Sequence, residues 1–446
     1  STEGDVYEDK LMSYFARLNY AYKDRYLLEA NFRADASSRF HKDNRWGFFP
    51  SFSAGWRINQ ESFMQDASWI DNLKLRASYG VLGNQNIGVY PYQQIYELGH
   101  DYPFGNPATL QSGAYMKTYN NPEITWEKTA ITDIGLDFSL LNGRFSGTLD
   151  YFYKYTSDIL APVEVSSIMG REVGQSNVGA VSNEGIEVNL TYNGQIGRDF
   201  RFSISPNFTW VRNAVEKLAN GATEEINNNR IVGQPIGIIY GYETDGLFVD
   251  QAEVDAATEQ LVSKSGLKPG YVKYKDISGP DGVPDGKVDA QYDRTVLGST
   301  TPKFYYGLNL STSYKGFDFS MLWRGVAKKD MYFYRGSNIY WGFMGGWWES
   351  CLTPEHLDYF RDQPGSKYSG LYEGDANINT DAYWPRPYLN NTEEAKNKNH
   401  ANTRYLQNAA YLRLQNVQLG YSFPRSITSK MHLEKLRIYF SGENLL

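Results

Sequence analysis

One short loop carries carboxylates at the spacing of a metal site. It holds four aspartates and a glycine at the expected turn: Asp281, Asp285, Asp289, Asp293 and Gly286. The first three fall at positions 1, 5 and 9 of a calcium-binding loop, whose oxygen ligands suit Ca²⁺. The match is incomplete, because Val283 replaces an oxygen ligand and Tyr292 stands where a bidentate glutamate belongs. Residues 281–293 are therefore interpreted as a Ca²⁺ or Mg²⁺ site or, alternatively, as a solvated acidic turn.

Aromatic side chains gather in two other segments and suit the binding of an organic ligand. The candidate ligand-binding residues are Trp341, Trp347, Trp348, Tyr383, Trp384 and Arg386, with Phe343 beside them. Aromatic faces next to a few polar groups can stack on sugar rings or on peptide side chains. The same rings could instead pack the loops together, become buried against a partner protein or lie in an aromatic belt at a membrane interface.

Several charged residues would look like acid–base pairs if each were considered alone: Asp133, Asp137, Asp150, Glu187, Arg57 and Arg76. A polar channel lining explains them better, because such charges bind water and enclosed protein without doing chemistry. The five histidines are too dispersed for a zinc motif, and the single cysteine, Cys351, cannot form an internal disulfide. With no nucleophile elbow or phosphate loop, an enzyme is not expected. A net charge of −7 gives no basic field for nucleic acid.

Residues 144–155 show what kind of element positions these side chains. Apolar and polar residues alternate there with a period of two. One face carries Phe145, Leu149, Tyr151, Tyr153 and Tyr155, and the other carries Ser146, Thr148, Asp150 and Lys154, with Phe152 as the exception. The pattern recurs along the chain, and strands of 10 to 12 residues match the roughly 9 to 11 needed to cross a bilayer at a tilt. The sequence therefore predicts an all-β protein, a transmembrane antiparallel up-and-down β-barrel.

The composition agrees with a barrel. Aromatic residues make up 15% of the 446 residues, and the 36 tyrosines suit the headgroup belts at both rims. The mean hydropathy of −0.54 looks hydrophilic, but alternating strands cancel in the mean. No run approaches the roughly 20 apolar residues of a transmembrane helix, which excludes a helical inner-membrane protein.

We expect the strands to form six pairs: 13–22 with 26–35, 49–59 with 73–81, 130–141 with 144–155, 185–193 with 200–213, 306–314 with 317–325, and 412–423 with 436–441. The first, third and fifth pairs turn at Lys23-Asp24, Asn142-Gly143 and Lys315-Gly316. Asn142-Gly143 predicts a two-residue type I′ turn. Four long connections lie between the pairs, at about 83–123, 156–184, 215–303 and 326–410. Because outer-membrane barrels keep short turns on the periplasmic side, these connections are predicted to be extracellular loops of one domain spanning 1–446.

Two alternatives are considered. A secreted all-β protein would show similar alternation, but its strands would be shorter and a dry core would have to satisfy many tyrosine hydroxyls. If such a protein were a calcium-dependent glycan-active one, it would be soluble without detergent. A passive porin or adhesin would share the barrel and would differ by lacking an upstream plug.

Six blocks, in order along nearly the whole chain, resemble the SusC/RagA class of TonB-dependent outer-membrane transporters. They are LKLRASYGVLGNQNIG (73–88), ITWEKTAITDIGLDFSLLNGRFSGTLDYFYKYTSDIL (124–160), VGQPIGIIYGYETDGLF (232–248), KYKDISGPDGVPDGKVDAQYDRTVLGSTTPKFYYGLN (273–309), YWPRP (383–387) and AAYLRLQNVQLGYSFP (409–424). The family counterpart of the acidic loop looks like a more compact DxNGDG segment.

The resemblance implies a 22-stranded barrel with an N-terminal plug, energised by TonB-ExbB-ExbD and capped by a SusD-like surface lipoprotein. It implies active import of a large nutrient across the outer membrane, an oligosaccharide ahead of a peptide, by a dimer of transporter–lipoprotein pairs. The chain begins without a signal peptide and carries about a dozen strands, so we expect it to be the C-terminal portion of such a barrel, without the plug.

Overall fold

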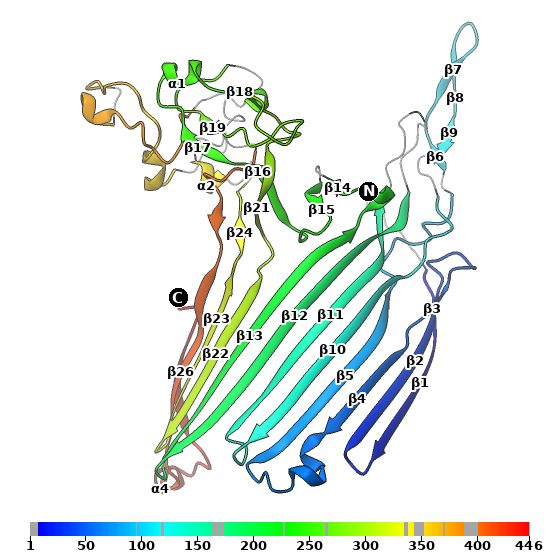
Figure 1. The fold of residues 1–446 in the computed structure, drawn as a ribbon, viewed down its shortest axis with the longest axis vertical. Helices are drawn as coiled ribbons and strands as arrows, with labels where there is room; N and C mark the ends of the chain where they lie inside the picture. The colour runs from blue at the N-terminus through cyan, green and yellow to red at the C-terminus, as the bar shows by residue number, and fades with distance from the viewer. Residues whose placement is uncertain are drawn as a thin grey trace. The chain divides into compact units, whose positions relative to one another are not determined.

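Long antiparallel strands follow one another through a single sheet in the computed structural model (Figure 1). The structure describes residues 8–94, 96–116, 120–162, 168, 174–225, 228–263, 266–333, 338–342, 352–368, 371–387 and 400–445. Within them, a 13-stranded sheet has the order β1-β2-β4-β5-β10-β11-β12-β13-β22-β23-β26-β27, with β3 paired to β2. Every strand on this path is hydrogen-bonded to its neighbours in chain order. The sheet is a meander, and β1 and β27 are its two ends.

The strands of this sheet are β1 (Leu11–Tyr22), β2 (Tyr26–Ser37), β3 (Trp46–Phe48), β4 (Ser51–Arg57), β5 (Ile70–Asn84), β10 (Glu127–Leu140), β11 (Phe145–Pro162), β12 (Gln175–Ile196), β13 (Phe200–Lys217), β22 (Phe304–Tyr314), β23 (Phe317–Ala327), β26 (Tyr411–Ser422) and β27 (Arg437–Glu443). All six predicted pairs are present. The prediction of an antiparallel meander from period-two alternation is confirmed.

The register places apolar residues in rows across one face of the sheet. Leu75, Leu136, Leu149, Val188 and Phe208 stand opposite one another on five successive strands. Moving one residue along each strand gives a row of the other kind that contains Arg76 and Asp150. Because side chains alternate along a strand, each row alternates in character, and the sheet has one apolar face and one polar face.

Two connections differ from the sequence prediction. The turn between β10 and β11 spans residues 141–144, and Leu141, Asn142 and Gly143 all have positive φ. The turn is therefore longer than two residues, and Asp71 accepts a hydrogen bond from its Gly143 N–H at 2.8 Å. The predicted loop at 156–184 is mostly strand, since β11 and β12 stay paired as far as Pro162 and Gln175.

A carboxylate holds the connection between β4 and β5, which contains two short 3-10 turns, η1 (Ile58–Gln60) and η2 (Ser62–Met64). Glu61, which is 9% exposed, accepts hydrogen bonds from Tyr26 Oη at 2.7 Å, Trp56 Nε1 at 3.0 Å and Arg25 Nη1 at 3.2 Å. These donors hold the pKa of Glu61 below its usual range, with Tyr26 the largest cause. The turn is thereby attached to the ends of β2 and β4.

Packing divides the chain into two compact units rather than one. Unit 1 comprises Ser1–Ile236, Lys303–Ala327 and Tyr411–Leu446, and unit 2 comprises Gly237–Pro302 and Lys328–Ala410. Unit 1 contains the sheet, a small buried cluster around Phe40 and Trp126, and paired strands β14 (Glu224–Glu225) and β15 (Arg230–Ile231). It also contains a long hairpin built from β6 (Tyr96–Leu98), β7 (Tyr102–Phe104), β8 (Thr109–Gln111) and β9 (Ala114–Met116).

Unit 2 is built from two segments that were predicted to be separate loops. Its elements are β16 (Ile238–Tyr242), β17 (Thr244–Leu247), α1 (Gln251–Asp255), β18 (Glu259–Gln260), β19 (Val272–Tyr274), β20 (Lys287–Val288), β21 (Arg294–Ser299), β24 (Asp330–Met331), α2 (Asn338–Trp341) and β25 (Gln407–Asn408). One further helix, α4 (Arg425–Thr428), belongs to unit 1. No described helix has the length and apolar character needed to cross a membrane.

Candidate functional site

The polar face of the sheet carries a network centred on one arginine. Arg76 Nε lies 2.8 Å from Asp137 Oδ1, its Nη1 lies 3.3 Å from Asp133 Oδ1, and its Nη2 contacts Asp150. β5, β10 and β11 contribute these residues, and their side chains are 13–30% exposed. One guanidinium therefore neutralises part of three carboxylates, and the group keeps excess negative charge. The three carboxylates share one cation across β5, β10 and β11, so the network links these strands on the polar face.

Glu187 and Arg57, the two remaining charged residues of the predicted channel lining, lie on the same face of the sheet, beside the Arg76 network. Glu187 stands opposite Asp150 in the register of β11 and β12. Arg57 stands opposite Lys74 in the register of β4 and β5. Gly135 was not identified from the sequence. It lies between Arg76 and Asp150 in the register and leaves room for the guanidinium.

The predicted ligand-binding tryptophans that the structure describes are buried in unit 2. Trp341 is 1% exposed and Trp384 is 4% exposed. Trp384 stacks on Tyr405 with ring centroids 5.6 Å apart and planes 12° apart. Both indole N–H groups are used internally, by Trp341 to Phe333 O at 2.6 Å and by Trp384 to Glu355 O at 3.1 Å. This burial gives the two rings a packing role, the first alternative stated for them, rather than a face open to ligand.

Tyr383 and Arg386 also make internal contacts. The hydroxyls of Tyr383 and Tyr340 are 3.1 Å apart, and Gln407 Nε2 donates to Tyr340 at 2.8 Å and to Tyr383 at 3.0 Å. Burial is the largest cause of the raised pKa of Tyr340, so its hydroxyl stays protonated. Arg386 forms an ion pair with Asp362, and its Cζ lies 5.2 Å from the centre of the Phe360 ring. Trp347, Trp348 and Phe343 lie outside the described residues.

The acidic loop uses its carboxylates to bind its own backbone. Asp293, which is 1% exposed, accepts hydrogen bonds at Oδ1 from the N–H groups of Ile277 at 2.8 Å and Ser278 at 3.2 Å, and at Oδ2 from Asp289 N–H at 2.8 Å. Asp289 Oδ1 in turn accepts from the N–H groups of residues 291 and 292, at 2.7 and 2.9 Å. The two bonds that Asp289 accepts are typical of an Asx turn, whereas Asp293 connects its own segment to residues 277 and 278.

The carboxylates of the acidic loop do not converge on a common point where a cation could bind. Asp285 Oδ1 accepts from Lys287 N–H at 3.0 Å, and Asp281 is exposed. Among the described residues, no group of three or more His, Cys, Asp or Glu side chains is placed to hold a metal ion. The four aspartates are therefore not brought together as a preformed ligand set. Binding of Ca²⁺ or Mg²⁺ by this loop stays a prediction, which titration of the protein with either ion would test.

The hairpin at residues 96–116 exposes aromatic rings that the sequence analysis did not select. Tyr102 is 64% exposed and Phe104 is 59% exposed, and their ring centroids are 5.0 Å apart. Leu110, on the paired strand, is 72% exposed. In Figure 1 this hairpin extends beyond the end of β5. The alternate placement of two aromatic residues before Gly105 and Asn106 was the signal that could have identified it.

An open meander of long strands with one apolar face rich in exposed aromatics and one polar, ion-paired face is the wall of a membrane β-barrel. The family model for the TonB dependent receptor-like beta-barrel matches residues 2–445, and the chain belongs to that family. The predicted SusC/RagA type, the barrel fold and the bacterial outer-membrane location are confirmed.

Curated relatives and a solved structure resemble this chain over nearly its whole length. The TonB-dependent receptor SusC of Bacteroides thetaiotaomicron is 31% identical over 430 residues, which are 93% of this chain and 38% of that protein. The TonB-dependent receptor P26 of Formosa agariphila is 31% identical over 450 residues, 98% of this chain and 41% of that protein. The RagAB peptide transporter has the same fold, with a TM-score of 0.74 and 24% identity over 98% of this chain and 44% of that one. The chain thus spans about two fifths of the length of these proteins.

Proposed function

We propose that the protein imports a large nutrient across the outer membrane with energy supplied through TonB. The observation that carries the proposal is the match of the TonB dependent receptor-like barrel model to residues 2–445, together with relatives that are named TonB-dependent receptors. In this function the chain supplies barrel wall and outer loops. No catalytic step is assigned to it.

We further propose that the partners are a SusD-like surface lipoprotein and TonB-ExbB-ExbD, in a dimer of transporter–lipoprotein pairs. The 31% identity to SusC supports the lipoprotein partner. The exposed rings of Tyr102 and Phe104 are apolar groups of the kind that protein interfaces bury, and they offer one place for contact with the lipoprotein or with cargo.

An oligosaccharide is proposed as cargo ahead of a peptide. The polar face of the sheet has a hollow of about 550 Å³ at β12, β13, β22 and β23. Seven of its 13 lining residues carry hydroxyl or amide groups, including Asn193, Ser203, Ser311, Ser313 and Ser320, and the charged Arg144, Arg201 and Asp318 line it as well. Hydroxyl and amide groups exchange hydrogen bonds with sugar hydroxyls, and the arginine and aspartate side chains add further donors and acceptors for them. A peptide remains the second cargo class, because amide groups bind the same side chains.

Purification of the full-length protein from native outer membranes tests the proposal. We expect a stoichiometric surface lipoprotein and a bound oligosaccharide, identified by mass spectrometry, and loss of growth on that glycan when either the transporter gene or TonB is deleted. Bound peptide would change the cargo class and keep the transporter. Unchanged uptake without TonB would overturn the proposal and favour a passive porin.

A further inference from the structure

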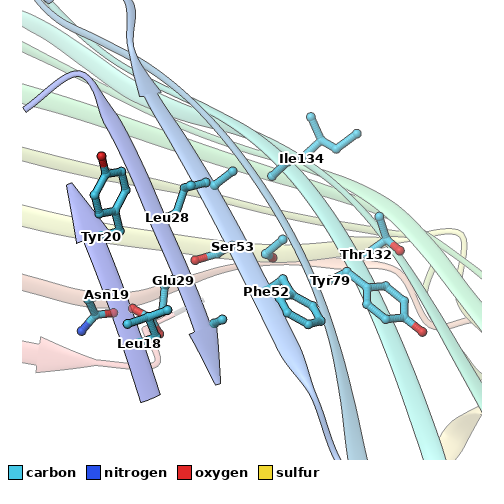
Figure 2. A pocket seen from close by; sticks show the side chains of 14 residues that line it. Leu18, Asn19, Tyr20, Leu28, Glu29, Phe52, Ser53, Tyr79, Thr132 and Ile134 are labelled. Atoms are coloured by element: carbon cyan, nitrogen blue, oxygen red, sulfur yellow. The ribbon is translucent and has the colours of Figure 1, made fainter. Parts of the chain in front are cut away.

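The apolar face of the sheet has a hollow over β1, β2, β4, β5 and β10 (Figure 2). Its volume is about 760 Å³. Two cross-strand rows on the apolar face supply most of its lining, and the row between them, whose side chains alternate to the other face, contributes Asn19, Glu29, Ser53 and Ser78. The first row is Tyr20, Leu28, Ala54, Ala77 and Ile134, and the second is Leu18, Ala30, Phe52, Tyr79 and Thr132. The lining is continuous with the apolar face of the sheet.

The hollow exists because small and large side chains are unevenly placed in these rows. Ala30, Ala54 and Ala77 leave space near the centre of β2, β4 and β5. Larger side chains surround them, including Phe52, which is 57% exposed, and Leu18, which is 69% exposed. A space lined by hydrocarbon offers water too few hydrogen-bond partners, so it favours an apolar occupant.

The strand register indicates the level of the membrane at which the hollow lies. The next row toward the short turns begins Tyr22, Tyr26 and Trp56, and these rings match the aromatic belt that lies at headgroup level. Short turns of outer-membrane barrels lie on the periplasmic side. The hollow therefore begins one row inside the periplasmic belt, at the level of the first part of the acyl chains.

A cation lies at the matching headgroup level. Lys23 is in the turn between β1 and β2, and its ammonium group lies 5.3 Å from the centre of the Tyr22 ring. Arg25, in the same turn, is paired with Glu61. Asp24 follows Lys23 in this turn, so the cation that the turn offers at headgroup level is the single ammonium group of Lys23. An ammonium group one row away from an apolar hollow is complementary to a lipid that has a phosphate at one end and a hydrocarbon chain at the other.

We propose that this hollow binds one acyl chain of a phospholipid of the periplasmic leaflet, with its phosphate toward Lys23. The face that contains the hollow is the lipid-facing surface of an outer-membrane barrel, so hydrocarbon already surrounds it. The three alanines let a chain lie closer to the strands than the larger side chains around them would. The proposal concerns the lipid contact alone and is independent of the cargo.

Native mass spectrometry of the full-length protein in mild detergent tests the site. The double variant Ala54→Leu/Ala77→Leu fills the hollow with side chains that suit a lipid-facing surface. Ala16→Leu is the matched control, because Ala16 lies on the same face of β1 and is not part of the lining. We expect the wild type and the control to retain one phospholipid and the double variant to retain at least about tenfold less. Lys23→Gln should speed release of the same lipid.

Equal phospholipid retention by the double variant and the wild type would overturn the proposal. Retention of lipid A in place of phospholipid would overturn the leaflet assignment and the role of Lys23. If the double variant kept its lipid but lost oligomer mass, the occupant would be a second copy of the protein. Heat-dependent gel migration shows whether each variant has folded, so a misfolded barrel is not counted as lost binding.

Discussion

The guanidinium of Arg76 lies against the backbone of Gly135, in a space that a side chain would fill. A Cβ atom on Gly135 would lie 2.6 Å from Arg76 Cζ and 2.3 Å from Asp150 Oδ1. Gly135 stands opposite Arg76 on one side and Asp150 on the other. The reach of Arg76 to carboxylates on two strands therefore depends on a residue that makes no side-chain contact of its own.

The substitution Gly135→Ala should destabilise the wall. The new methyl group must displace the guanidinium, and overpacking of this kind costs about 1–3 kcal/mol. Thermal unfolding, followed by the loss of heat-dependent gel migration, should show a lower melting temperature. Gly88→Ala is the control, because nothing lies within 4 Å of a Cβ at that position. An unchanged melting temperature for Gly135→Ala would contradict the assigned role.

Trp384→Ala should loosen both segments of unit 2. Removing a buried tryptophan typically costs about 3–5 kcal/mol. Because Trp384 shares a core with Val272 and Tyr274, hydrogen exchange should rise at residues 271–275 as well as around the mutation. Tyr368→Ala is the control, since Tyr368 is 90% exposed. Exchange that rises only near residue 384 would show that the two segments do not form one packed unit.

The stability of unit 2 should fall in mild acid through His400. Burial lowers the pKa of His400 below 6.5, with the Arg294 charge as a second cause. The unfolded chain then binds more protons than the folded one below about pH 6.5, so stability is present above that pH and falls as the pH drops through the lowered value. Protease resistance of unit 2 should decline between about pH 7.5 and pH 5.5.

His400→Gln should flatten this pH dependence, and a substitution at the exposed His432 should leave it unchanged. If His400→Gln kept the wild-type pH profile, another group would have to be responsible.

Asp293→Asn should destabilise the acidic loop without any metal being involved. The amide keeps one acceptor and turns an N–H₂ group toward backbone N–H donors, at a cost of about 2 kcal/mol or more. Asp281→Asn, at an exposed position, should change little. If the loop is a solvated acidic turn, Ca²⁺ should leave the melting temperature unchanged, because Asp293 already accepts three N–H groups. A calcium-dependent rise that Asp285→Asn removes would support the ion site.

The strands of the barrel wall could be predicted because the pattern that specifies each of them lies within a short stretch of sequence. Each strand must put apolar residues toward lipid and polar residues toward the lumen, so the period of two reports both the element and its faces. The prediction ended too early on β11 because Asp158, with a φ of 57°, interrupts the alternation at a register shift. At a bulge the two faces exchange, and the pattern stops being readable although pairing continues.

The candidate site could not be predicted in the same way. Trp341 ends the one-turn helix α2 and Trp384 forms an isolated bridge, and neither element is long enough for a periodicity that tells a buried ring from an exposed one. Their burial depends on contact between two segments far apart in the sequence, and single-sequence patterns do not report such contacts. Asp293 was identified as a charged residue, but its three backbone partners come from a loop geometry that the sequence does not specify.

The strictly sequential order of the wall has a consequence for how such barrels change over evolutionary time. Each strand on the sheet path pairs with its neighbours in chain order, so a hairpin such as β10 and β11 depends on two flanking strands alone. Duplicating or losing a whole hairpin leaves every remaining side chain on its original face, whereas losing a single strand reverses the direction of all that follow. A wall of this kind can therefore widen or narrow most readily in steps of two strands.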